Sequence, residues 1–94
     1  MSEVDACRAD VWLWRARFFR TRSLAAKYLE AGRVRLTRAG HESRLEKPAR
    51  PVKIGDLLVF ALGGRLIAVT VEGLGDRRGP APDAQTLYST IDAT

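Results

Sequence analysis

The most informative functional residues of this 94-residue chain are its lysines and arginines, whose side chains can bind anions. Between Arg8 and Lys53 there are thirteen Arg and Lys residues against four acids, a local charge of +9, whereas the whole chain carries +5. Each Lys or Arg placed on a phosphate releases a condensed counterion. Charge concentrated in half of a small domain is therefore typical of a polyanion-binding surface, with nucleic acid as the leading partner.

Residue types for catalysis and metal binding are scarce. The single cysteine, Cys7, cannot form an internal disulfide, and with the single histidine, His41, it cannot build a metal site. Cys7 is either a reactive thiol or, as we favour, a bystander near a frayed terminus. The sequence has no phosphate-cradling glycine loop and no cofactor fingerprint. We therefore predict no catalytic residue, metal, cofactor or small-molecule substrate, and so a protein that is not an enzyme.

The size of the chain fits one soluble domain. Hydrophobic residues make up 46% and charged residues 29% of the sequence, an ordinary balance for a globular protein. The longest apolar runs, at 57–62 and 66–71, are far shorter than the ~20 residues of a membrane helix. Residues 1–7 lack the basic start and apolar core of a signal peptide. We expect no membrane span and a cytoplasmic protein.

Two helices are predicted to position most of the basic residues. Apolar residues recur at helical spacing over 9–19, which predicts the first helix. Thr21 can cap a second helix at 22–31 by accepting a hydrogen bond from a free backbone N–H. Gly32 stands where a helix often ends in a left-handed residue, so the second helix has both a start and a stop signal.

After the second helix the apolar period changes to two. Val34 and Leu36 alternate with Arg33 and Arg35, which predicts a strand with one buried face and one basic face. Residues 37–51 are polar and are predicted to form a turn, an irregular short strand and a loop.

The rest of the chain is predicted to complete the core. Residues 54–56 form a turn into a hairpin, whose strands at 57–61 and 65–71 flank the turn residues Gly63 and Gly64. Residues 73–82 form a loop. Asp83 caps a last short helix at 84–88, before a tail that frays.

The order of these features resembles the S-four type RNA-binding domain, named after a ribosomal small-subunit protein. The resemblance rests on Arg8, Asp10 and Leu13, on Thr21-Arg22-Ser23 with Ala25 and Leu29, on Gly32-Arg33-Val34, and on Val52-Lys53-Ile54-Gly55-Asp56. A narrower resemblance, to the heat-shock-protein-fifteen family of ribosome-associated proteins, rests on Trp12-Leu13-Trp14, Ala16-Arg17-Phe18-Phe19, and Arg77-Arg78 before Leu87-Tyr88.

The resemblance implies a small α+β fold of the α-L type, with two short helices on a small, mostly antiparallel sheet and a short C-terminal helix. It divides the chain into a disordered N-terminus at 1–7, an RNA-binding domain at 8–72, and a loop, helix and tail at 73–94 that pack on the domain. The implied partner is structured ribosomal RNA or tRNA on the large ribosomal subunit, and the chain is expected to be a monomer in isolation. The implied role is heat-shock rescue or quality control of stalled nascent chains, and these two stay open.

Carried over residue by residue, the resemblance gives ten candidates for RNA contact. They are Arg8, Arg15, Arg20, Thr21, Arg22, Ser23, Lys27, Arg33, Arg35 and Lys53. The sequence departs from the family at Val11, where lysine is usual, and at Ala39-Gly40, where an Asn-Gly turn is usual. We expect Asp10 to orient an arginine such as Arg8, and Asp56 to have a structural role.

Several alternatives remain at this point. Trp14 and Phe18 could stack on unpaired bases or pack against Leu87 and Tyr88 of the C-terminal helix, and packing is favoured. Two short helices in a basic setting also resemble a DNA-binding helix-turn-helix. The chain could instead be an RNA-binding accessory module of an RNA-modifying enzyme.

Overall fold

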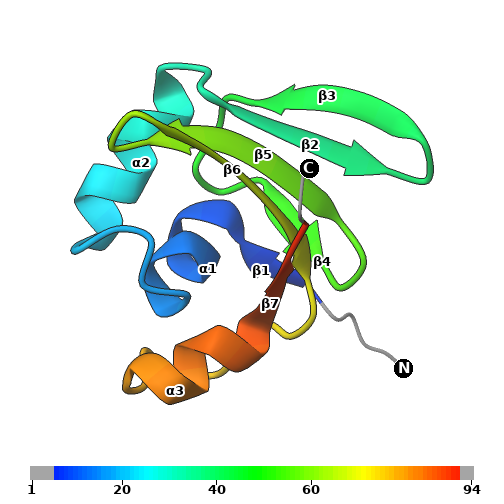
Figure 1. Ribbon diagram of the computed structural model, residues 1–94. Helices are drawn as coiled ribbons and strands as arrows, with labels where there is room; N and C mark the ends of the chain where they lie inside the picture. Colours follow the sequence, from blue (N-terminus) through cyan, green and yellow to red (C-terminus); the bar gives the residue numbers. More distant parts are fainter. Residues whose placement is uncertain (1–5, 92–94) are drawn as a thin grey trace.

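Helices packed on an antiparallel sheet form the α+β fold that the sequence predicts, in a computed structural model that describes residues 6–91 (Figure 1). In chain order the elements are β1 Ala6–Arg8, α1 Ala9–Arg15, α2 Arg22–Glu30, β2 Val34–Arg38, β3 His41–Leu45, β4 Pro51–Lys53, β5 Leu57–Leu62, β6 Arg65–Val71, α3 Ala81–Ala84, the 3₁₀ turn η1 Gln85–Leu87, and β7 Tyr88–Thr90. No described helix is long and apolar enough to cross a membrane.

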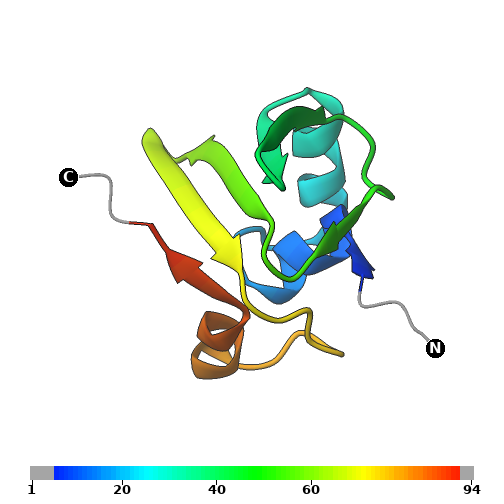
Figure 2. The ribbon, with the colours of Figure 1, turned by 90° about the vertical axis from the view of Figure 1, so that its right-hand side faces the viewer.

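The strands form two sheets on either side of α1. Five strands pair in the order β3-β2-β5-β6-β7, and β1 pairs with β4 in a separate two-stranded sheet. In Figure 2, α1 lies between the β1–β4 pair and strand β6. The arrangement leaves α1 and α2 packed together against the inner face of the larger sheet.

The core is built from the alternate residues of the central strands and from one side of each helix. Leu58 and Phe60 of β5 and Val69 of β6 are at most 1% exposed and meet the buried side of α1, where Trp12 is fully buried. The Trp12 indole N–H donates to the Gly73 carbonyl over 2.8 Å, so this buried donor is satisfied. The alternation in 34–36 and in the 57–71 hairpin predicts these buried positions correctly.

Helix α1 is shorter than the predicted helix at 9–19. The Phe18 N–H donates to the Leu13 carbonyl over 3.1 Å and the Arg17 N–H donates to the Trp14 carbonyl over 3.0 Å. This pair of bonds closes a helix C-terminus, with Arg17 in the left-handed region at φ 66°. The apolar run continues past Arg15 because the residues beyond the helix also face the core.

Phe18 enters the core after this turn. Its ring centroid lies 4.8 Å from that of Tyr88 and 5.3 Å from that of Phe60. The predicted packing of Phe18 on the C-terminal segment is therefore confirmed. Trp14 is covered differently, because the guanidinium carbon of Arg78 lies 5.7 Å from the centre of its ring.

Helix α2 has the start and stop signals that the sequence predicts. The Thr21 hydroxyl accepts a 3.1 Å hydrogen bond from the Leu24 N–H. Gly32 follows the helix with φ 72°, and its N–H donates to the Leu29 carbonyl over 2.8 Å. Leu24 itself lies outside the buried stripe, since it is 48% exposed.

Residues 37–51 are more regular than predicted. Strand β3 pairs with β2 in unbroken register from Val34↔Leu45 to Arg38↔His41. The two turn residues, Ala39 at φ 52° and Gly40 at φ 81°, have the positive φ angles of a primed hairpin turn. The prediction of an irregular strand was wrong because alanine is a poor signal for such a turn. Strand β4 then pairs with β1.

The turn at Ala39 gives a stability prediction. An L residue other than asparagine or aspartate is disfavoured in the left-handed region, and asparagine is the preferred first residue of this turn. We expect Ala39→Asn to raise the free energy of unfolding by about 0.5 to 1 kcal/mol. Urea denaturation measures this change. Gly40→Ala should act in the opposite direction, and an Ala39→Asn protein no more stable than the parent would contradict the argument.

The C-terminal segment also differs from the prediction. Helix α3 begins after Pro80 rather than at Asp83, which lies in its first turn and accepts a 2.6 Å bond from the Thr86 hydroxyl at its backbone carbonyl. Residues 88–90 form strand β7 instead of ending a helix in a frayed tail, because their backbone pairs with β6. The end of the predicted tail, at 92–94, lies outside the described residues.

The predicted disordered N-terminus is corrected in part. Ala6 and Cys7 belong to β1, where backbone pairing with Lys53 and Val52 fixes them. Residues 1–5 of that segment lie outside the described residues.

Candidate nucleic-acid interface

The start of α2 gathers four of the ten candidate residues. Arg20, Thr21, Arg22 and Ser23 are all exposed. A surface groove of about 350 Å³ lies beside them, lined by Asp10, Arg22, Ser23 and Ala26. The first backbone N–H groups of a helix favour an anion at this position, and Arg22 adds a full positive charge. The groove therefore brings the positive charge of Arg22 and a helix N-terminus next to the Asp10 carboxylate.

Arg8 joins this groove through Asp10. The Arg8 Nε and Nη2 atoms donate to the two Asp10 carboxylate oxygens over 3.1 and 3.0 Å. Asp10 also accepts a 2.8 Å bond from the Val11 N–H and is 4% exposed. The hydrogen bond from Arg8 to Asp10, followed by their charge attraction, raises the pKa of Arg8. The predicted role of Asp10 in orienting Arg8 is confirmed.

Strand β2 carries two more candidates. Arg33, just before the strand, and Arg35 are exposed, as the alternation predicts. The Arg33 guanidinium carbon lies 6.0 Å from the centre of the Tyr28 ring. The Arg35 Nη1 atom lies 2.8 Å from Glu42 Oε2 of β3. Arg35 therefore has an acidic partner, although Glu42 is seven positions away in the sequence. Both partners are more than half exposed, so the pair is weak and opens readily to a phosphate.

Arg15 is half-buried and binds the loop after β6. Its Nη1 atom donates to the Gly75 carbonyl over 2.9 Å and the Leu74 carbonyl over 3.3 Å, and lies 3.5 Å from the Cys7 sulfur. Its Nε is buried with no partner among the described residues. The structure therefore gives Arg15 a packing role that its place in the charge cluster does not indicate.

Cys7 lies beside Arg15 and is half-buried. Burial raises the pKa of its thiol above the ordinary value, which the positive charge of Arg15 opposes. The thiol is therefore less ionised than a free cysteine at neutral pH, which agrees with a bystander rather than a reactive group.

Lys27 and Lys53 do not line the groove, although Lys27 lies one helical turn after Ser23. The Lys27 side chain is exposed on α2. Lys53 is exposed at the end of β4, and its backbone N–H donates to Asp56 Oδ2 over 2.8 Å. Asp56 is 2% exposed and is also held by Arg38, with its Nε 2.8 Å from Oδ1 and its Nη2 2.7 Å from Oδ2. The predicted structural role of Asp56 is confirmed.

Sequence reasoning missed four basic residues that lie between the end of β2 and the start of β4. They are Arg38, Arg44, Lys47 and Arg50. In the predicted irregular segment they had no assigned orientation. The signal that could have placed them is the alternation in β3, where Leu45 is buried and Glu42 and Arg44 are exposed. Arg44 is the cross-strand partner of Arg35, so two arginines lie opposite each other on the outer side of the hairpin.

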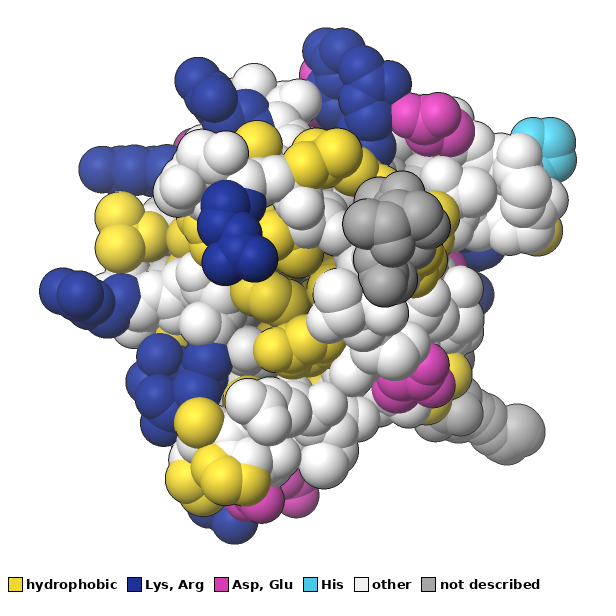
Figure 3. Space-filling model, viewed as in Figure 1, with side chains coloured by type: hydrophobic (Ala, Val, Ile, Leu, Met, Phe, Trp, Pro, Cys, Tyr) yellow, Lys and Arg dark blue, Asp and Glu magenta, His cyan; other side chains and the backbone are white. Residues whose placement is uncertain are grey.

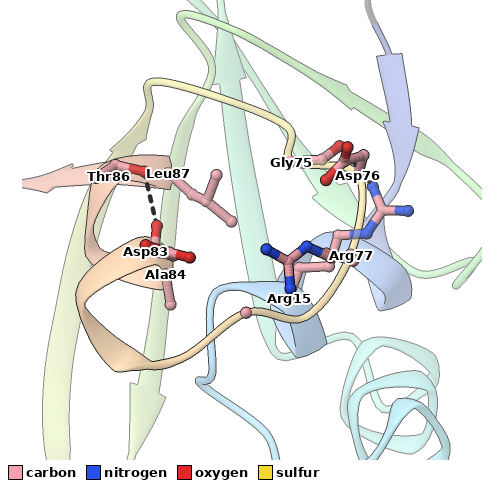
Figure 4. A pocket seen from close by; sticks show the side chains of 9 residues that line it. Arg15, Gly75, Asp76, Arg77, Asp83, Ala84, Thr86 and Leu87 are labelled. Carbon is pink, nitrogen blue, oxygen red and sulfur yellow. Dashed lines mark hydrogen bonds between the residues drawn. The ribbon is translucent and has the colours of Figure 1, made fainter.

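A set of hydrogen bonds, here called the loop clasp, ties α1 to the loop after β6. Besides the bonds of Trp12 and Arg15, the Arg17 Nε donates to the Gly79 carbonyl over 2.8 Å and the Arg78 Nε donates to the Trp14 carbonyl over 3.1 Å. A small cavity of about 160 Å³ lies beside the clasp, lined from α1, the loop and the α3–η1 segment (Figure 4). In the clasp, the side chains of Arg15, Arg17 and Arg78 donate hydrogen bonds to backbone carbonyls. These three arginines therefore stabilise the fold.

Comparison with known proteins places the chain in a family. No family model matches it. The heat shock protein 15 homolog of Haemophilus influenzae is 33% identical over 94 residues, which are all of this chain and 67% of that protein. Heat shock protein 15 of Escherichia coli K12 is 35% identical over 81 residues, 86% of this chain and 57% of that protein. The chain thus spans roughly six tenths of the length of these curated relatives.

A solved structure agrees with the sequence relatives. Heat shock protein 15 of Vibrio cholerae, solved as a trimer, matches with a TM-score of 0.80 and 37% identity over 93% of this chain and 83% of that chain. The expectation of a monomer for the present chain stays a prediction. On this sequence identity and shared fold, the chain belongs to the heat shock protein 15 family.

Proposed function

We propose that this chain binds structured ribosomal RNA or tRNA through its basic surface. The basic surface is defined as the exposed candidates Arg8, Arg20, Arg22, Lys27, Arg33, Arg35 and Lys53, with Thr21 and Ser23. The observation that carries the proposal is the groove at the start of α2, which is lined by Arg22, Ser23 and Asp10, the last being the ion-pair partner of Arg8. Such a site holds a phosphate of the backbone, which positions an RNA without reading its sequence.

Membership of the heat shock protein 15 family supports a ribosomal target. The S-four type resemblance of residues 8–59 supports structured RNA as the ligand, and the family resemblance supports the large ribosomal subunit. The role we propose is rescue or quality control of stalled nascent-chain complexes. It is a binding role without catalysis, metal or cofactor.

The first test compares RNA with DNA. Fluorescence anisotropy should give a higher affinity for an RNA hairpin than for duplex DNA of equal length. The affinity should fall with salt by ~0.7 to 0.9 log units per log unit for each phosphate contacted. Equal affinity for the DNA duplex would overturn the RNA assignment and favour the helix-turn-helix alternative.

The second test addresses the ribosome. The protein should sediment with isolated large subunits more than with small subunits, and most with large subunits that carry a stalled nascent chain. Sedimentation with small subunits alone would contradict the proposed target.

A further inference from the structure

Aromatic rings form a continuous cluster between α2 and the end of the chain. Phe60 of β5 is at its centre and is 1% exposed. The Phe18 ring lies 5.3 Å from Phe60 and 4.8 Å from Tyr88, and the Tyr28 ring lies 6.5 Å from Phe60 and 5.1 Å from Phe19. We call Phe18, Tyr28 and Tyr88 the aromatic strip, because these three stay partly exposed while Phe19 and Phe60 are buried.

The β5–β6 hairpin extends this strip beyond the helices. Leu62 and Ile67 share the inner face with Phe60, as the register Phe60↔Ile67 requires, and both are partly exposed. Figure 3 shows hydrophobic side chains gathered in the middle of this side of the molecule, with Lys and Arg side chains along its upper and left edges. The described residues therefore form a partly exposed apolar surface with basic side chains on two of its edges.

Two arginines belong to the edge of the strip. Arg33 lies over the Tyr28 ring at 6.0 Å. Arg65 is the cross-strand partner of Leu62, so by the alternation of a strand it is on the same face as Leu62 and Ile67. Neither Arg33 nor Arg65 takes part in an ion pair among residues 6–91. Arg65 also lies outside the basic half of the sequence and has no role in the basic surface.

We propose that the aromatic strip binds unpaired nucleotides that flank the structured RNA, an inference that rests on the proposed function. Unpaired bases stack on the partly exposed rings of Phe18, Tyr28 and Tyr88, and Arg33 and Arg65 contact the adjoining phosphates. Aromatic rings interleaved with basic side chains are the arrangement by which proteins hold single strands. Base stacking tolerates any sequence, because every base has a π face.

The charge of the edge decides between an RNA segment and an apolar protein segment as occupant. Arginines that form no ion pair among the described residues gain most from a ligand that carries one negative charge for each stacked group. A nucleotide chain has that repeat, whereas an apolar peptide or a second copy of this basic chain does not.

The test uses two RNAs and two variants of the full chain. One RNA is a blunt hairpin, and the other is the same hairpin with an unpaired extension of about four nucleotides. By anisotropy, the unchanged protein should bind the extended hairpin about tenfold more tightly. Tyr88→Leu and Arg65→Ser should each remove most of that gain and leave the affinity for the blunt hairpin unchanged. Arg77→Ser, an exposed arginine in the loop after β6, is the matched control and should keep the gain.

The outcomes separate this inference from the proposed function. Equal affinity of the unchanged protein for the two RNAs, or full gain in the variants, overturns the inference while RNA binding stands. No binding of either RNA overturns both. If sedimentation velocity shows self-association that Tyr88→Leu and Arg65→Ser abolish, the strip binds a second copy and the inference is wrong. Arg65→Ser keeps the test valid even if Tyr88→Leu disturbs the packing of Phe18, because Arg65 is exposed.

Discussion

Replacing Arg22, Arg33 and Arg35 together with alanine is expected to weaken binding to a structured RNA about a hundredfold, since a hydrogen bond to a charged group contributes about 1.5 to 3 kcal/mol before partial replacement by water. The salt dependence of binding should also become shallower by ~0.7 to 0.9 log units for each lost phosphate contact. Fluorescence anisotropy at several salt concentrations measures both changes.

The same triple variant should unfold at nearly the temperature of the parent. Arg22 and Arg33 form no ion pair among residues 6–91, and Arg35 has only the exposed pair with Glu42. A collapse of the fold would mean that these arginines are structural. Two single variants, each of which removes one exposed arginine, provide a matched comparison. Arg22→Ala should lower the affinity for RNA, whereas Arg77→Ala should not. If Arg77→Ala weakens binding as much, net charge rather than the basic surface governs affinity.

Asp56→Ala should lower the free energy of unfolding by about 2 to 3 kcal/mol. The Asp56 side chain is 3% exposed and accepts two hydrogen bonds from Arg38 and one from the Lys53 N–H. Its removal leaves the N–H of the turn unpaired. Arg38 is 36% exposed, so water replaces part of the lost interaction and the loss stays at the low end for a buried ion pair. Urea denaturation followed by circular dichroism measures the change.

Two further variants test the cause of that loss. Asp56→Asn keeps an acceptor for the Lys53 N–H and should recover part of the stability. Glu42→Ala removes the 2.8 Å ion pair between Arg35 and Glu42, whose side chains are both exposed. This change should lower the free energy of unfolding by no more than about 0.5 kcal/mol. Equal losses for Asp56→Ala and Glu42→Ala would show that burial of the carboxylate is not what makes the first pair matter.

The elements that the sequence predicts well are those whose signals are local. Thr21 and Gly32 define both ends of α2 because a cap and a left-handed residue act within a few positions of the helix. Gly63 and Gly64 define the hairpin for the same reason. In each case the responsible residue touches only its near neighbours in the chain, so the sequence contains the whole interaction.

The elements that the sequence misses depend on distant partners. The apolar run 9–19 continues past the end of α1 because Phe18 packs on Tyr88, seventy positions away in the chain. Strand β7 exists through its pairing with β6 and has no turn signal before it. Periodicity predicts that these residues are buried but not what covers them.

The candidate site shows the same division. The i, i+2 pair of Arg8 and Asp10 is predictable, because the two side chains are neighbours in the sequence. The use of Arg15 in the loop clasp is not predictable, because its partners are backbone carbonyls about sixty residues later, and a carbonyl has no signature in a sequence. Charge alone therefore overestimates how many arginines are available to a ligand.

The loop clasp also sets an order on the folding of this chain. Its hydrogen bonds join residues 59 to 64 positions apart. During synthesis at about 5 to 20 residues per second, the loop follows α1 by roughly 3 to 12 s. Helix α1 thus receives these stabilising contacts only after the loop has been synthesised. A nascent chain that stops before Gly79 would hold α1 without the carbonyl that binds Arg17, and would remain incompletely folded around α1.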